Sequence, residues 1–195
     1  MFSRRIKDEG FVNIATAIQG FKAGLVSINV SNTGLGKKAA TALGNALRKN
    51  VNYTQTLTVL DVSNNNLGPE GVASLADFLA QPNNVKRLLL GNTGPNVEAL
   101  FAPLARGCTQ ALTHLDLSNN KFAKKPTVSQ ASFEQFFSSV LSLKHVDFSG
   151  SKLTPAYLDA LLARLVGNGT PYHACIYSSS HVSRHLGCRP QPPGQ

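Results

Sequence analysis

Residues 112–122 read LTHLDLSNNKF, with apolar side chains at the first, fourth, sixth and eleventh positions. The alternation of apolar and polar residues predicts a short strand, because successive side chains of a strand point to opposite faces. The polar SNN that follows is typical of a turn. One such segment would mean little, but four others start 27–32 residues apart: LVSINVSNTGL (25–35), LTVLDVSNNNL (57–67), VKRLLLGNTGP (85–95) and LKHVDFSGSKL (143–153).

A helical pattern follows each of these segments. Val72, Leu75 and Leu79, for example, are spaced to share one face of a helix. The equivalent triads are Phe11/Ile14/Ile18, Ala40/Leu43/Leu47, Val97/Leu100/Leu104, Phe133/Phe136/Val140 and Leu158/Leu161/Leu165. One unit cannot bury its own apolar stripe, whereas stacked units can. The pattern is that of leucine-rich repeats. It predicts an α/β solenoid (a horseshoe) with parallel strands on the concave face and helices on the convex face.

Local signals refine this prediction. At the ninth position of the pattern, Asn65 and Asn120 are expected to bond backbone groups left free where the strand turns, and Thr33, Thr93 and Ser151 to do so less fully. Thr154 is expected to cap a helix that begins at Pro155. Pro103 should shorten or kink its helix.

The repeat pattern also sets the expected domain organisation. We expect residues 1–168 to form the solenoid, with about five strand–helix repeats and a partial first repeat whose strand is missing. The next strand would fall within residues 170–175, where Pro171 removes a backbone donor. We therefore predict that residues 169–195 form a divergent, disordered tail outside the solenoid. The alternative is that Ile176, Tyr177 and Val182 fold back as an improvised cap.

Composition narrows the class of protein. The 195 residues favour one domain, and 42% hydrophobic residues supply a sizeable core. No apolar run approaches the ~20 residues that span a bilayer. The first residues lack the apolar core of a secretory signal, and three cysteines cannot all pair within the chain. Reduced thiols in the cytoplasm are the better interpretation.

The charge is +9 and unevenly distributed, with no Asp or Glu between Glu9 and Asp61. Two groups of cations are predicted to face a membrane and to make weak contact with anionic lipid: Lys37, Lys38, Arg48 and Lys49, and then Lys121, Lys124 and Lys125. A merely solvated basic surface is the alternative. No nucleic acid is expected, because no aromatic residues interleave with these cations to stack bases.

Further details go beyond the generic repeat. They are FLAQPN (78–83), LARGC (104–108), a basic Pro-containing insert ending in FEQFFSS (133–139), and FSGSKLTPAYLDALL (148–162). With these details, roughly residues 6–168 resemble the leucine-rich-repeat domain of the CARMIL family, which links actin capping protein, the branched-actin nucleating complex and myosin-I.

The resemblance implies a cytoplasmic, cytoskeletal scaffold at the leading-edge plasma membrane. It implies a function in actin filament assembly, lamellipodium protrusion and cell migration. The expected partners are proteins of the actin assembly machinery, with capping protein bound through regions absent here. No enzyme activity and no cofactor are expected. Two alternatives remain: a leucine-rich-repeat GTPase-activating protein, and a ligand-sensing or inhibitor horseshoe, although an inhibitor of a basic ribonuclease should be acidic rather than +9.

The concave face supplies the candidate site. Its outward positions include seven residues that we expect to bind a protein partner: Asp61, Arg87, Leu89, His114, Asp116, His145 and Asp147. A catalytic triad is not expected, because Ser118 lies four strand residues, about 13 Å, from His114. Stacked histidines and stacked aspartates on neighbouring strands would instead make the surface sensitive to pH.

The segment after residue 168 is rich in possible metal ligands, but no metal site is predicted there. The residues are His173, Cys175, His181, His185 and Cys188. Their spacing matches no standard zinc finger. Cys108, at a helix end, is expected to be a buried structural thiol.

Overall fold

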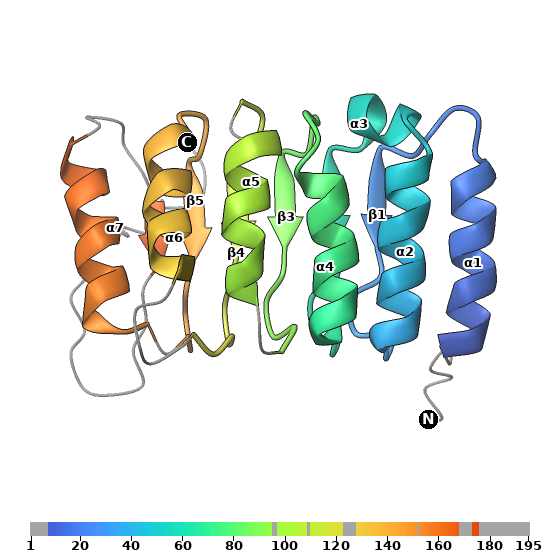
Figure 1. Ribbon diagram of the computed structural model, residues 1–195, viewed down its shortest axis with the longest axis horizontal. Coiled ribbons are helices and arrows are strands. Elements are labelled where there is room, and N and C mark those ends of the chain that lie inside the picture. Colours follow the sequence, from blue (N-terminus) through green and yellow to red (C-terminus); the bar gives the residue numbers. More distant parts are fainter. Residues whose placement is uncertain are drawn as a thin grey trace, which may run out of the picture.

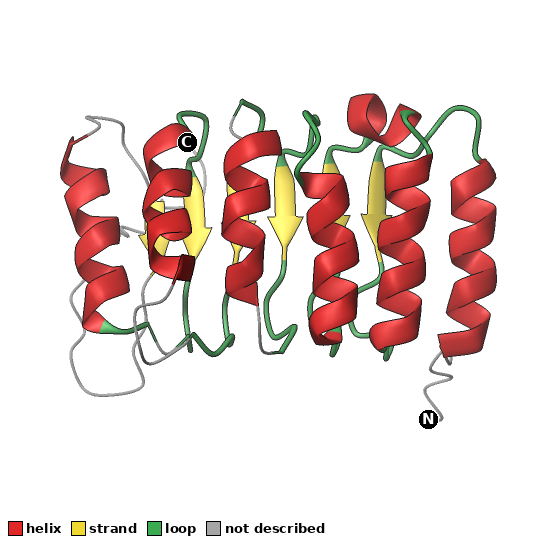
Figure 2. Cartoon of the chain, viewed as in Figure 1, coloured by secondary structure: helices red, strands yellow, loops and turns green. Residues whose placement is uncertain are grey.

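In the computed structural model, a row of helices covers one face of a parallel sheet (Figure 1). The structure describes residues 8–94, 97–108, 110–122, 128–151, 153–167 and 173–175. Strands and helices alternate along the chain, and each unit stacks on the previous one (Figure 2). This is the predicted leucine-rich-repeat solenoid, and the strand face is its concave side.

The sheet has six strands in sequence order, all of them parallel to their neighbours. They are β1 (Ser27–Asn29), β2 (Val59–Asp61), β3 (Arg87–Leu89), β4 (His114–Asp116), β5 (His145–Asp147) and β6 (His173–Cys175). The middle residue of each strand pairs with the middle residue of the next, as Leu60 does with Leu88 and Leu88 with Leu115. Because that residue points into the core, its two neighbours in each strand face outward.

The helices form the second layer. They are α1 (Asp8–Gly20), α2 (Lys37–Lys49), α3 (Asn52–Thr56), α4 (Gly68–Leu79), the 3₁₀ turn η1 (Val97–Leu100), α5 (Phe101–Gly107), α6 (Val128–Ser139) and α7 (Pro155–Gly167). As predicted, Pro103 lies in a short helix, the seven-residue α5, which a 3₁₀ turn precedes.

The core lies between the two layers and becomes aromatic towards β5. Phe133 is fully buried at the centre of this region, with its ring centroid 4.9 Å from Phe101, 4.6 Å from Phe137 and 5.0 Å from Tyr157. Offset and edge-to-face contacts of this kind stabilise a core beyond the area they bury. The aromatic cluster therefore joins α5, α6 and α7, which short strands alone would hold weakly.

The predicted stripe of the first helix is wrong in one residue. Phe11 and Ile18 are buried, but the third buried residue is Ala15, and Ile14 is 37% exposed. The reason is that α1 has a neighbouring helix, α2, on one side among the described residues. Val12 and Ile14 are left on its other side.

The prediction that the sheet ends with β5 is also wrong. His173–Cys175 forms β6 and pairs in register with β5, so that His145 lies beside His173 and Asp147 beside Cys175. Pro171 does not prevent this pairing, because it precedes the first paired residue. Residues 168–172 and 176–195, which include the proposed cap residues Ile176, Tyr177 and Val182, lie outside the described residues.

The buried asparagines confirm the prediction for the ninth position. Asn120 donates to the carbonyls of Leu90 and Leu117 at 2.8 and 3.0 Å, and its Oδ1 accepts from the Thr93 amide at 3.1 Å. Asn65, two repeats earlier, likewise donates to the carbonyls of Val30 and Val62, and its Oδ1 accepts from the Leu35 amide. Each asparagine thus ties its own turn to that of the preceding repeat.

Ser151 and the two threonines make fewer contacts, as expected. The hydroxyls of Thr33 and Thr93 each donate to a carbonyl of their own turn, at 2.8 and 2.9 Å. The expected side-chain cap at Thr154 is wrong. The helix α7 does begin at Pro155, but the Thr154 hydroxyl is buried and has no hydrogen-bond partner among the described residues.

Candidate functional site: the strand face

Two rows of side chains cross the strand face. The first residues of the strands form one row, Ser27, Val59, Arg87, His114 and His145, and the third residues form the other, Asn29, Asp61, Leu89, Asp116 and Asp147. The structure therefore brings together the seven residues that the sequence pattern placed on this face. Three neighbouring residues of the first row are basic, and we call them the basic row: Arg87, His114 and His145.

The two histidines of the basic row stack. Their ring centroids lie 4.3 Å apart, with 22° between the ring planes. The parallel register of β4 and β5 imposes this arrangement, because it places His114 directly beside His145. The Thr113 hydroxyl lies 2.8 Å from Nδ1 of His114 and restrains that ring.

The surroundings of His114 disfavour its charged form. Burial lowers the pKa of His114, and the positive charges of His145, Arg87 and Lys144 lower it further. Arg87, Lys144 and His145 are exposed, whereas His114 is half-buried between them. Sequence reasoning missed Lys144 as part of this surface, although its position directly before an outward strand residue was a visible signal.

The carboxylates of the second row are engaged in turns. Asp116 accepts a hydrogen bond from the Ser118 amide at 2.8 Å, and Asp147 accepts one from the Ser149 amide at 2.7 Å. Asp61 accepts from both the amide and the hydroxyl of Ser63, at 3.0 and 2.7 Å, and is only 8% exposed. Hydrogen bonds of this kind fix a turn locally. The aspartates therefore shape the rim of the strand face, and Asp61 offers little surface to a partner.

The third repeat interrupts the row of aspartates. It has Leu89 and Gly91 where the second, fourth and fifth repeats have Asp and Ser, and Leu89 is half-buried. A Cβ atom on Gly91 would lie 2.8 Å from Oδ2 of Asp116 and 2.7 Å from Oγ of Ser118. The absence of a side chain at Gly91 thus leaves space for the turn that Asp116 and Ser118 form in the next repeat.

Cys108 is a structural thiol, as predicted. It is fully buried and lies 3.3 Å from Nδ2 of Asn83. Burial raises the pKa of the Cys108 thiol to about 12, although the hydrogen bond with Asn83 acts in the opposite direction. The thiolate, which is the reactive form, is therefore strongly disfavoured. Among the described residues there is no group of three His, Cys, Asp or Glu side chains that could hold a metal ion.

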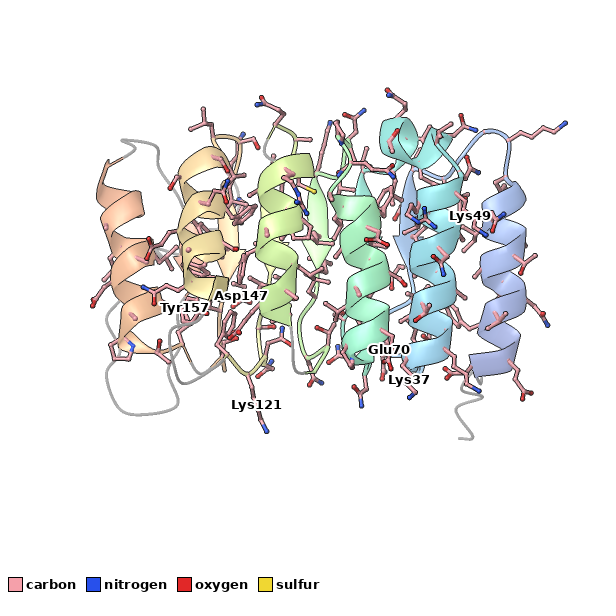
Figure 3. The ribbon with its side chains drawn as sticks, viewed as in Figure 1. Lys37, Lys49, Glu70, Lys121, Asp147 and Tyr157 are labelled. Carbon is pink, nitrogen blue, oxygen red and sulfur yellow. The ribbon has the colours of Figure 1, made fainter. Side chains whose placement is uncertain are left out.

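The predicted membrane-facing cations do not gather in one place. Lys37 and Lys38 begin α2, whereas Arg48 and Lys49 end it, and all four are exposed. Figure 3 shows Lys37 and Lys121 at one edge of the solenoid and Lys49 towards the opposite end of α2. Lys124 and Lys125 lie outside the described residues. No helix in the described part of the chain is long and apolar enough to cross a membrane.

Comparison with known proteins agrees with the repeat geometry. Family models described as "Leucine Rich repeat" and "Leucine Rich Repeat" match residues 54–76 and 111–134. "Capping protein, Arp2/3 and myosin-I linker protein 2" of Mus musculus is 38% identical over 160 residues, 80% of this chain and 12% of that protein. "Protein CARMIL" of Dictyostelium discoideum is 33% identical over 166 residues, 85% of this chain and 15% of that protein.

The chain is a leucine-rich-repeat homologue of the CARMIL proteins. It spans 12% of the length of the mouse relative, so the match concerns one part of that protein. "Rho GTPase-activating protein gacW" of Dictyostelium discoideum is also similar, at 28% identity over 158 residues, 81% of this chain and 14% of that protein. The repeats thus occur in proteins whose names refer to different activities, and the CARMIL matches have the higher identity.

Proposed function

We propose that this chain is a non-catalytic scaffold of a CARMIL-type actin regulator and that the strand face is its partner-binding surface. The observation that carries the proposal is the strand face itself. Seven side chains chosen from the repeat pattern share one surface, and Arg87, His145 and Lys144 are exposed on it. A concave array of this kind offers a partner a large surface without any conformational change.

The proposed partners come from the relatives. The printed name of the mouse relative refers to capping protein, Arp2/3 and myosin-I. We infer that this chain works with the same actin assembly machinery, in the cytoplasm and at the leading-edge membrane, and thereby supports filament assembly, protrusion and migration. Capping protein itself is proposed to bind CARMIL-type regulators elsewhere than on these repeats, so that Arp2/3 complex and myosin-I are the first candidates for the strand face.

Binding by purified proteins tests this proposal. The chain is immobilised and exposed in turn to capping protein, Arp2/3 complex and myosin-I. Leu89→Arg places a bulky charge in the middle of the strand face, and Ala73→Arg is the matched control on the exposed side of α4. We expect at least one of the three proteins to bind, and to be lost with Leu89→Arg but not with Ala73→Arg. Binding that survives Leu89→Arg in a folded variant would refute the strand face as the partner surface.

A further inference from the structure

One part of the strand face gathers basic side chains on neighbouring strands. Arg87, His114 and His145 occupy the same register position on three consecutive strands, and Lys144 directly precedes His145. The register continues into β6, where His173 takes the equivalent position. Among the described residues, neither the Arg87 nor the Lys144 side chain makes an ion pair.

The nearest carboxylates on these strands lie in the other row of the strand face. Asp116 and Asp147 lie two residues further along the same strands, about 7 Å away at the usual rise per strand residue. Both accept hydrogen bonds from the backbone of the following turn. The charges that His114 faces from β3 and β5 are those of Arg87, Lys144 and His145, and all of them act to lower its pKa. The basic row is therefore a surface on which an anion would relieve repulsion.

We propose that the basic row, with Lys144, binds an acidic peptide segment of a partner protein and binds it more tightly as the pH falls. This inference rests on the proposed function, because it specifies the partner for the same strand face. Carboxylates suit the row because Arg87 can hold one by two parallel hydrogen bonds. Adjacent strands lie about 4.8 Å apart, so an extended acidic segment running across them meets a new basic side chain at each strand.

Other anions fit this surface less well. The ten outward residues of β1–β5 include no Phe, Tyr or Trp on which a base could stack. A continuous polyphosphate would also meet the row of Asp116 and Asp147 beside the basic row. A bilayer is flat or gently curved, whereas the basic row lies on the concave side of the solenoid. These observations favour a flexible acidic peptide over nucleic acid or lipid.

The pH dependence follows from the thermodynamic coupling between proton binding to His114 and peptide binding. At neutral pH, burial and neighbouring cations keep His114 mostly uncharged. A bound carboxylate favours the protonated imidazole, so proton binding and peptide binding must strengthen each other. Peptide glutamates, with an ordinary pKa near 4.3, stay ionised down to about pH 5.5. Affinity should therefore rise as the pH falls from about 7.5 to about 5.5. Simple loss of negative charge on the peptide would instead lower the affinity over this range.

Fluorescence anisotropy with a labelled Glu/Ser peptide and the full chain tests the inference. We expect saturable binding at low salt, tighter by about threefold to fivefold at the lower pH, since one additional charge–charge contact is worth up to about 1 kcal/mol, a factor of about five. Arg87→Gln should weaken binding at both pH values by a similar factor. His114→Asn should retain binding at about pH 7.5 but show a smaller increase at low pH. Lys49→Gln, an exposed cation at the end of α2, is the matched control and should change nothing.

Several outcomes would overturn the inference. They are the absence of saturable binding at both pH values, equal weakening by Lys49→Gln and Arg87→Gln, and tighter binding of single-stranded DNA or anionic vesicles than of the peptide. Each of these can occur while Leu89→Arg still abolishes binding of an actin-assembly protein, and the proposed function would then stand. If Leu89→Arg leaves partner binding intact, the proposed function fails whether or not the peptide binds.

Discussion

Single asparagine side chains connect the repeats. Asn120 is 1% exposed and satisfies backbone groups of its own turn and of the preceding one. The ninth-position pattern predicted this role from sequence, because an amide can donate and accept at once.

The conformation at the eighth position of the repeat was not predicted. Asn32, Asn64, Asn92 and Asn119 all adopt positive φ, between 52° and 55°, and Gly150 takes this position in the last of the five repeats. Local turn chemistry, rather than apolar spacing, selects these residues.

Asn120→Ala should destabilise the solenoid. The substitution leaves the Leu90 carbonyl, the Leu117 carbonyl and the Thr93 amide without their side-chain partner in a buried site. Each unsatisfied buried group costs about 1–3 kcal/mol, so we expect a loss of at least about 2 kcal/mol in the free energy of unfolding. Asn13→Ala, on the exposed side of α1, should change it by less than about 0.5 kcal/mol. Urea denaturation of the two variants compares them, and equal stability would contradict the role given to Asn120.

His114 should make stability depend on pH. Its pKa is lowered in the folded chain, so the unfolded chain binds more protons near the ordinary histidine pKa of about 6.5. Stability is therefore expected to fall as the pH drops below that value, and to recover above it. His114→Asn should reduce this fall. Urea denaturation at about pH 7.5 and about pH 5.5 measures the difference, and an unchanged pH dependence in the variant would show that His114 does not contribute.

At the scale of elements, periodicity predicted β1–β5 and the helices that follow them, but not the end of the sheet. The spacing did point to residues 170–175 for a further strand. Pro171, which has no backbone N–H to donate, spoke against that strand. In the structure the pairing begins at His173, after the proline, and Ala174 pairs with Val146. Backbone pairing to an existing strand edge needs little apolar side-chain surface, and apolar periodicity does not report it.

Removing β6 should lower stability more than removing the segment after it. Truncation after residue 168 deletes His173–Cys175 and exposes the backbone edge of β5 and the core residue Val146, which is 3% exposed in the intact chain. Lost hydrogen bonds of about 0.5–1.5 kcal/mol each predict a decrease of about 1–3 kcal/mol. The matched control is truncation after residue 175, which keeps β6. Thermal melts should show a lower Tm, by a few degrees, for the shorter chain. Identical Tm values for the two truncated chains would mean that β6 contributes nothing.

At the scale of the whole molecule, the charge of +9 is spread over separate surfaces. The repeat pattern alone assigned the seven strand-face residues to one surface, because period-two alternation fixes their direction. The pattern does not assign the cations of α2 to one surface. Lys37 and Lys49 are the first and last residues of the 13-residue helix α2. They lie about 18 Å apart along its axis, more than twice the Debye length of ~8 Å at physiological salt.

Binding to anionic vesicles should accordingly be weak and sensitive to salt. Each lysine near an anionic leaflet contributes about 1 kcal/mol, and cations on different edges cannot all reach a flat membrane together. In co-sedimentation at low and at physiological salt, we expect binding only at low salt. Lys37→Gln with Lys38→Gln should reduce it, and Arg87→Gln, on the strand face, should not. Vesicle binding that persists at high salt would reject this electrostatic account.

The central claim is that partners bind the strand face of the solenoid. It is tested most directly by a photo-reactive benzophenone side chain at position 89 on β3, compared with the same group at position 73 on α4, in the presence of purified Arp2/3 complex and myosin-I. The account predicts that position 89 forms a covalent adduct with at least one of these proteins and that position 73 forms none. Adducts from position 73 alone, or none from either position, would contradict it.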